Sequence, residues 1–438
     1  MEIFAAQIKR FIPKNAFIRS VALLTGVNVL SQVIVVASSP LLTRLYTPEE
    51  MGILSAFTSI TMVLLSIVAW LYETAIPLPR EEKKAINILA VAVSIVLIMC
   101  TLTAIGVAFF GGQMALVVNS PSVEPYLWLL PVGLLGAGLY QVLSYWAVRK
   151  KEFPSLANTR WHESLSIVVS QLGLGLLKLG SFGLLMGIVV GRLVSNGGLI
   201  KLILTQSKDA LKRISMKGMW DVVKRYRRFP LISSWSALLN AVAFQLPYLL
   251  LTMFYGPQVL GWVALAQRVL GLPFNLLGTS VGQVYLAEAA RIKDDHRQLM
   301  HLFMKTVKHL TFVGVPALGL IVLAAPWAFS VVFGPNWTEA GKYLQAMAVM
   351  FFMQLVATPI RGNLYVLERQ DLHLYCEIIR LTLMSGSLLL ATYLNKSAIV
   401  AVIYLGIGGS IGNFMPIVFS WWAVRRSCRN KRSESDDC

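Results

Sequence analysis

Four arginines interrupt stretches of the chain that are otherwise apolar: Arg192, Arg268, Arg361 and Arg380. A charged side chain at membrane depth is costly, so it usually lines a wet path or has a specific partner. The guanidinium group is planar, stays charged and can hold a phosphate through two parallel hydrogen bonds. We therefore interpret these arginines as candidates for a cavity that accepts a phosphate-bearing substrate.

Each arginine also has a simpler interpretation. Arg380 follows Glu377 by one helical turn, which favours a structural ion pair equally well. Arg361 lies close to the end of its stretch and could extend its charge to the membrane surface. Arg192 and Arg268 have no acidic neighbour on the same helical face, and we predict that these two face the cavity.

Three acidic residues, Glu73, Glu163 and Glu377, are candidates for carrying a coupling proton or sodium ion. The competing interpretation is that they cap helices or pair with arginines. Enzyme signatures are incomplete: His162-Glu163 begins a zinc-protease motif without its second histidine, and Gly341-Lys342 has no phosphate-binding loop before it. The four cysteines are scattered. We predict no enzyme, metal site or cofactor.

The elements that position these residues are long uncharged segments. The chain has 438 residues, of which 56% are hydrophobic and only 14% charged. A soluble protein could not bury that much apolar surface, and continuous apolar runs are typical of membrane helices rather than of a barrel. Since about 20 apolar residues cross a bilayer, we predict about twelve spans. They lie near residues 20–43, 51–77, 85–111, 125–148, 160–178, 181–204, 229–254, 259–287, 308–333, 343–366, 370–394 and 398–424.

The positive charges alternate with these spans. Most of the 39 lysines and arginines fall at the two ends of the chain and in every second gap. The gaps between them hold only Arg44, Lys178, Lys342 and Lys396. Positive residues stay on the cytoplasmic side, which predicts that both termini are cytoplasmic. The net charge of +18 therefore follows topology and indicates no nucleic-acid partner.

The longest basic gap divides the predicted spans into two sets of six. We predict an N-terminal lobe over 1–204, a linker over 205–228, a C-terminal lobe over 229–424 and a basic tail over 425–438. Apolar and basic residues alternate in the linker at helical spacing. This pattern is typical of a helix on an anionic membrane surface, and a docking site for a cytoplasmic partner is the alternative.

The two halves also share a sequence element at the same place. LLTRLYTPEEMG (41–52) aligns with LLTMFYGPQVLG (250–261), and Leu, Leu, Thr, Tyr, Pro and Gly coincide. Each copy connects the first and second spans of its half. Because six spans return the chain to the same side, the copies have parallel orientation. Repeats of this kind build many transporters.

At the Tyr-x-Pro-x-x-x-Gly element, and at Tyr72-Glu73-Thr74-Ala75-Ile76-Pro77-Leu78-Pro79, the chain resembles the Wzx-type polysaccharide and O-antigen flippases. These belong to the multidrug/oligosaccharidyl-lipid/polysaccharide exporter superfamily. The resemblance covers nearly the whole chain. It implies an all-α integral membrane fold like that of the MATE transporters, with two six-helix lobes around a cavity that opens alternately to either side. The second copy departs from the first at Met253 and Gln258, which replace Arg44 and Glu49.

The resemblance also implies a cargo and a location. The cargo would be an undecaprenyl-pyrophosphate-linked oligosaccharide for O-antigen, capsule or exopolysaccharide, flipped to the outer leaflet of the bacterial inner membrane. Polysaccharide polymerase and chain-length machinery are candidate partners. The principal alternative is an ion-coupled multidrug or cation antiporter of the same superfamily, which would need deep acidic groups where this chain has arginines. A flippase for peptidoglycan precursors usually has more spans, and a non-transporting scaffold is the third alternative.

Overall fold

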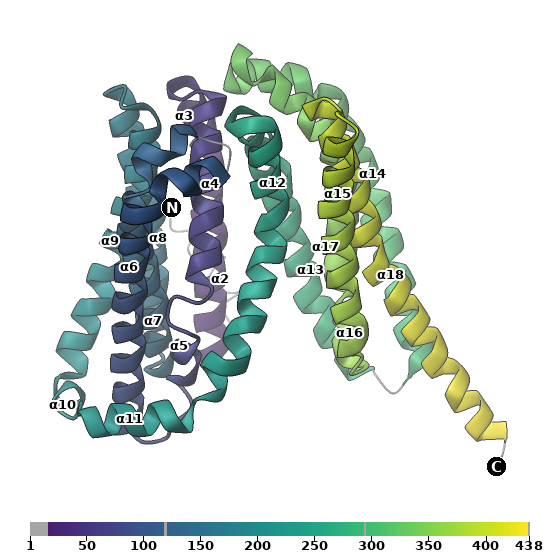
Figure 1. Ribbon diagram of the computed structural model, residues 1–438. Helices are drawn as coiled ribbons and strands as arrows, with labels where there is room; N and C mark the ends of the chain where they lie inside the picture. Colours follow the sequence, from purple (N-terminus) through teal and green to yellow (C-terminus); the bar gives the residue numbers. More distant parts are fainter. Residues whose placement is uncertain (1–15, 118–120, 293–294, 437–438) are drawn as a thin grey trace, which may run out of the picture. The chain divides into compact units, whose positions relative to one another are not determined.

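A computed structural model describes residues 16–117, 121–292 and 295–436, and within these ranges the chain forms helices and no strands (Figure 1). The predicted all-α fold is confirmed. The basic residues of the first fifteen positions, which contributed to the predicted topology, lie outside the described part. The helices are α2 (Ala16–Ala37), α3 (Ser39–Leu45), α4 (Pro48–Leu65), α5 (Tyr72–Ala75), α6 (Glu82–Val117), η1 (Pro121–Tyr126), α7 (Leu129–Arg149), α8 (Phe153–Leu176), α9 (Gly180–Gln206), α10 (Lys208–Leu211), α11 (Met216–Arg225), η2 (Phe229–Ser233), α12 (Ser234–Ala266), η3 (Gln267–Gly271), α13 (Leu272–Arg291), α14 (His296–Phe333), η4 (Pro335–Trp337), α15 (Thr338–Ile360), α16 (Gly362–Val366), α17 (Gln370–Tyr393) and α18 (Ala398–Asp436).

Every predicted span overlaps a helix, because helices alone satisfy the backbone of a continuous apolar run within the same segment. In the described residues, nine stretches are long and apolar enough to cross a membrane. One of them, Phe229–Arg291, has 63 residues, enough for two crossings. The number of crossings therefore stays a prediction.

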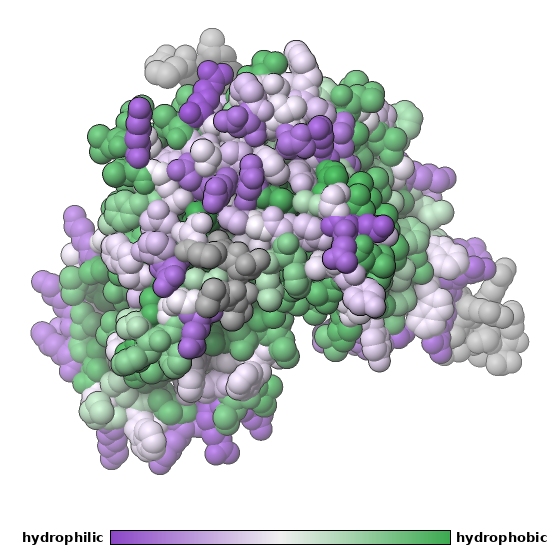
Figure 2. Space-filling view, turned by 45° about the horizontal axis from the view of Figure 1, so that its top comes forward, coloured by the Kyte–Doolittle hydropathy of each residue, from purple (hydrophilic) through white to green (hydrophobic). Residues whose placement is uncertain are grey.

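The surface of the protein agrees with a lipid environment. Phe109, Phe312 and Leu323 are 77%, 80% and 83% exposed. Apolar residues cover much of the face seen in Figure 2. Exposed apolar area of this extent is unusual for a soluble monomer and is ordinary for a surface that faces acyl chains.

The chain forms two compact units. Unit 1 contains residues 1–46 and 56–245, and unit 2 contains residues 47–55 and 246–438. In unit 1, α6, α7, α8 and α9 pack together around buried side chains that include Trp146 and Leu134. The helices α8 and α9 approach closely because small residues line their interface. A Cβ atom on Gly187 would lie only 2.4 Å from Gln171, and one on Gly191 only 2.2 Å from Ile167.

The second predicted span is not one helix. We expected continuity over 51–77, but α4 ends at Leu65 and a short α5 starts at Tyr72. Between them, Trp70 and Leu71 have φ angles of 49° and 57°. This left-handed conformation is strained for residues other than glycine and breaks the helix. The break places the Tyr72–Pro79 motif in the short helix α5 and the turn after it, rather than in a continuous span.

The basic segment 205–228 contains two helical segments, α10 and α11. Ser215 caps α11 by accepting a hydrogen bond from the backbone N–H of Gly218 at 3.1 Å. The helix lies across the end of unit 1 and contacts α6 (Figure 1). Tyr72 fixes it there by donating a hydrogen bond from its hydroxyl to the carbonyl of Val223.

Unit 2 is built on α15, which packs against α13, α14 and α18, while α17 packs on α18. Trp337, Phe351 and Leu405 are buried in its interior. Gly256 has a φ of 83° and interrupts α12. This interruption falls in the predicted gap between spans 229–254 and 259–287, because glycine tolerates this conformation and Pro257 starts the next helical segment.

The repeated motifs contact each other within unit 2, which also contains the first turns of α4. A Cβ atom on Gly52 would lie 1.7 Å from the carbonyl oxygen of Pro257. Reciprocally, a Cβ atom on Gly261 would lie 1.8 Å from the carbonyl oxygen of Pro48. Each glycine therefore admits the proline of the other copy, and no larger residue fits at either position.

The two motif tyrosines also contact corresponding helices. Tyr46 donates a hydrogen bond to the carbonyl of Gln171 on α8 at 2.6 Å. Tyr255 accepts one from the hydroxyl of Thr392 on α17 at 3.4 Å. Because α8 and α17 are the fifth helical spans of their halves in the predicted order, the repeat found in the sequence extends to its contacts.

Candidate functional site

Arg192 lies on α9 in the interior of unit 1. Its side chain is 8% exposed, and its Nη1 atom is buried with no hydrogen-bond partner in the described residues. A buried cation without a full set of partners is destabilised by several kcal/mol relative to one in water. Such a group is a natural binding point for an anion, which would supply the missing hydrogen bonds.

The backbone around Arg192 is held by polar neighbours. Its carbonyl accepts hydrogen bonds from Ser195 and Asn196, both at 2.8 Å. Asn196 also donates to the carbonyl of Gly136 on α7 at 2.9 Å. At Gly136 an added Cβ atom would lie 3.1 Å from the Cβ atom of Arg192. These contacts fix the arginine at the interface between α7 and α9.

Glu163 is placed on α8 and interacts electrostatically with Arg192. Its direct ion pair is with Arg160, at 3.3 Å. The Arg160 side chain is 48% exposed, so this pair is worth little on its own. The interpretation of Glu163 as an arginine partner is supported by this contact, and an ion-coupling role stays a prediction.

Glu73 is the most deeply buried acid of the predicted set, with 1% of its surface exposed. One carboxyl oxygen accepts a hydrogen bond from the Gln141 amide on α7 at 2.7 Å, and the other has no partner in the described residues. Within the part of the chain that the structure describes, Glu73 forms no ion pair with a loop arginine. A buried carboxyl with no cation beside it is suited to hold a proton or to take up a cation.

Arg149, at the end of α7, was not among the residues predicted from sequence. Its guanidinium donates hydrogen bonds to four carbonyls of the turn after α5, with distances from 2.6 to 3.3 Å. They belong to Ile76, Pro77, Pro79 and Arg80. Prolines in this turn have no N–H group to donate, so carbonyls of the turn lack helical partners. The sequence signal for the contact was the position of Arg149 in the next basic gap along the chain.

In unit 2, Arg361, Arg380 and Glu377 form one cluster. The Glu377 carboxylate accepts from Arg361 at 3.1 Å and from Arg380 at 2.5 Å. Arg361 also donates to the Asn413 side-chain oxygen on α18 at 3.3 Å. All three charged side chains are at most 22% exposed. The structural ion pair expected for Arg380 is therefore present, and it includes Arg361 as well.

Arg268 lies on the π-helical turn η3 between α12 and α13. It is half-buried, and its side chain has no ion pair or hydrogen bond within the described residues. π-Helical turns inside α-helices occur frequently at functional sites. No residue pattern predicts this turn, because its residues are compatible with an ordinary helix.

The predicted arginines therefore fall into two classes. Arg361 and Arg380 share one carboxylate, which leaves a net positive charge in their cluster. Arg192 and Arg268 have no ion-pair partner in the described part of the chain. Both units hold uncompensated positive charge, which suits an anionic ligand. Within the same ranges, no group of His, Cys, Asp and Glu side chains could hold a metal ion.

Comparison with known proteins places the chain in a family. A family of polysaccharide biosynthesis proteins matches residues 41–342, more than half of the sequence. The chain belongs to this family. The match includes both copies of the repeated motif, the turn after α5, Arg192 and Arg268.

Two curated relatives have names that agree with this assignment. The succinoglycan biosynthesis transport protein ExoT of Rhizobium meliloti is 26% identical over 71% of this chain and 61% of its own length. The teichuronic acid biosynthesis protein TuaB of Bacillus subtilis is 23% identical over 66% of this chain and 58% of its own length. The chain thus spans about three fifths of these relatives.

Solved structures define the fold. An inward-facing MATE-family multidrug transporter of the MOP superfamily aligns with a TM-score of 0.70 at 16% identity, over 92% of this chain and 96% of its own. The lipid II flippase MurJ in an inward closed conformation aligns with a TM-score of 0.66 at 13% identity, over 93% and 90%. The MATE-like fold is confirmed, and its relatives are transporters.

Proposed function

We propose that this protein flips a lipid-linked oligosaccharide, carried on undecaprenyl pyrophosphate, from the cytoplasmic to the outer leaflet by alternating access. The observation that carries the proposal is the pair of arginines without ion-pair partners, Arg192 and Arg268. A pyrophosphate offers each guanidinium the acceptors that the described residues lack. The family and the names of the curated relatives support a polysaccharide precursor as cargo.

The two arginine classes have different roles in this proposal. Arg192 and Arg268 contact the pyrophosphate, while Glu377 holds Arg361 and Arg380 in place and limits their charge. Glycan hydroxyls would meet amide side chains, and the polyprenyl tail would remain in lipid. Polysaccharide polymerase and chain-length machinery would act on the product after translocation.

Deletion of the gene tests this function. The lipid-linked oligosaccharide should accumulate on the cytoplasmic face, and surface polysaccharide should fall. Complementation with the wild-type gene should restore both. Normal outer-leaflet delivery in the deletion strain, with no other flippase gene present, would contradict the proposal.

A cation antiporter is the second candidate, and the buried carboxyl of Glu73 favours it. An organic cation bound there would be paired with a carboxylate in an apolar environment. Drug susceptibility distinguishes the candidates, because an antiporter mutant becomes sensitive to cationic drugs while its surface polysaccharide is unchanged.

A further inference from the structure

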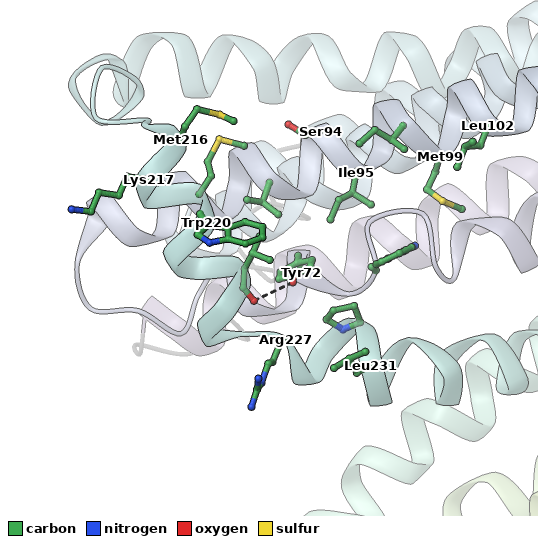
Figure 3. Close-up of a pocket in the computed structure, with 16 residues that line it drawn as sticks. Tyr72, Ser94, Ile95, Met99, Leu102, Met216, Lys217, Trp220, Arg227 and Leu231 are labelled. Atoms are coloured by element: carbon green, nitrogen blue, oxygen red, sulfur yellow. Dashed lines mark hydrogen bonds between the residues drawn. The ribbon is translucent and has the colours of Figure 1, made fainter.

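An apolar groove of about 960 Å³ runs between α6 and α11 in unit 1 (Figure 3). One wall is a stripe on α6 that includes Ile95, Met99 and Leu102, spaced as one helical face. The opposite wall is the apolar face of α11, with Met219 and Trp220. The groove opens to the surface of the protein, and hydrocarbon dominates its lining.

Two cations border the groove: Lys217 lies in the first turn of α11, and Arg227 lies two residues after its end. Lys217 and Arg227 contribute their side-chain stems to the lining, and in Figure 3 their charged ends point away from the apolar interior. Neither has an acidic partner within the described residues. A second apolar cavity of about 570 Å³, farther along α6 near Phe110 and Leu130, has no lysine or arginine in its lining. Of these two apolar cavities, the groove under α11 is the one bordered by basic side chains.

The length of the groove indicates what fits. The α6 stripe runs from Val91 to Leu102, which at about 1.5 Å per residue is roughly 16 Å. Half of a hydrocarbon core of about 30 Å is about 15 Å. An acyl chain from one leaflet would fill the groove with its phosphate beside the two cations, whereas a polyprenyl chain of undecaprenyl length would extend far beyond it.

The family motif is part of this groove. Tyr72 lines it and holds α11 through its hydrogen bond to Val223. Trp70, brought to the surface by the strained turn after α4, is 45% exposed and lines the same cavity. Strain of this kind persists only where the surrounding structure enforces it, and it is concentrated at ligand sites.

We infer that this groove is a binding site for one anionic phospholipid of the membrane, with its acyl chain along α6 and its phosphate at the basic border that Lys217 and Arg227 provide. Bound lipid would contact both α11 and α6. It would thereby hold in place the segment between α11 and α12. The inference does not depend on the cargo, so its failure would leave the proposed flippase function intact.

Native mass spectrometry of the purified full chain tests the site, with phosphatidylglycerol and phosphatidylcholine as probes. We expect the wild type to retain one phosphatidylglycerol in preference to phosphatidylcholine. Since each basic residue near a membrane surface contributes about fivefold to anionic lipid binding, Lys217→Gln with Arg227→Gln should weaken it by roughly 25-fold. Lys208→Gln with Lys212→Gln removes the same charge outside the groove and should have no comparable effect.

A second pair of variants separates the groove from general surface charge. Ser94→Trp fills the groove and should abolish retention of phosphatidylglycerol. Ile105→Trp, on α6 outside the groove, should retain it. Equal binding of the two phospholipids to the wild type, or full retention in Ser94→Trp, would overturn the inference. Binding of polyprenyl phosphate without any binding of phosphatidylglycerol would also overturn the inference and assign the groove to a different lipid.

Discussion

The reciprocal contact of the two repeated motifs makes a quantitative prediction. In Gly52→Ala the new methyl group would lie 1.7 Å from the carbonyl oxygen of Pro257, whereas ordinary contacts begin at 3.4 Å. The two segments would have to separate by about 1.7 Å, and a backbone carbonyl cannot rotate away as a side chain can. Overpacking of this kind costs about 3 kcal/mol at the upper end of its usual range. The helical preference of alanine returns about 1 kcal/mol.

We therefore expect Gly52→Ala to lower the free energy of unfolding by about 2 kcal/mol. Thermal unfolding in detergent, followed by circular dichroism, measures the change as a lower midpoint. Gly319→Ala is the matched control, because no atom lies within 4 Å of its added Cβ, and this variant should be unchanged or slightly more stable. Gly261→Ala should resemble Gly52→Ala, since its Cβ would lie 1.8 Å from Pro48.

The double variant gives the sharper test. Once one alanine has separated the segments, the second has room, so Gly52→Ala with Gly261→Ala should cost clearly less than the two single effects added together. Strict additivity, or a wild-type midpoint for Gly52→Ala, would refute the reciprocal contact.

Three further predictions concern charged groups. Glu377→Gln should destabilise the protein by about 3–5 kcal/mol, because it leaves two buried arginines without their carboxylate; adding Arg380→Met should recover part of the loss in thermal unfolding, and no recovery would contradict a shared ion pair. Glu73→Gln keeps a hydrogen-bond acceptor for Gln141, so we expect a folded protein whose transport no longer depends on pH in vesicles; an unchanged pH profile would exclude proton coupling at this residue. Hydrogen bonds from the backbone N–H groups of residues 298 and 297 lower the pKa of Asp295 below its ordinary 3.8, so its capping of α14 is complete at neutral pH and lost as the pH falls through the lowered value. Asp295→Ala should therefore speed amide exchange in the first turn of α14 at pH 7 but not below that pKa, and an equal effect at both would contradict the charge-dependent cap.

Much of the fold could be predicted because the hydrocarbon interior of a membrane requires each spanning segment to satisfy its own backbone hydrogen bonds. Uncharged runs must be helices, and every predicted span overlaps one. The helix break before Tyr72 could not be predicted, since Trp70 and Leu71 carry no turn signature and adopt left-handed conformations under tertiary constraint. The turn η3 could not be predicted either, because its residues are compatible with an α-helix.

The candidate site was only partly accessible from sequence. Glu377 and Arg380 are neighbours on one helix, so their ion pair could be expected. The contact of Arg361 with Glu377 joins different helices, and no spacing rule predicts it. The same applies to Glu73 and Gln141, and to the mutual packing of Gly52 and Pro257. Each depends on which helices pack together, which a single sequence does not specify.

The most direct test of the proposed mechanism is transport by a purified variant in liposomes. Arg192→Ala with Arg268→Ala should fold normally and reduce flipping of an undecaprenyl-pyrophosphate oligosaccharide at least about tenfold, since charge-assisted hydrogen bonds contribute roughly 1.5–3 kcal/mol each. Arg213→Ala with Arg297→Ala removes the same charge from exposed positions and should transport normally. Wild-type flipping by the Arg192 and Arg268 variant would contradict the assignment of these arginines to the pyrophosphate.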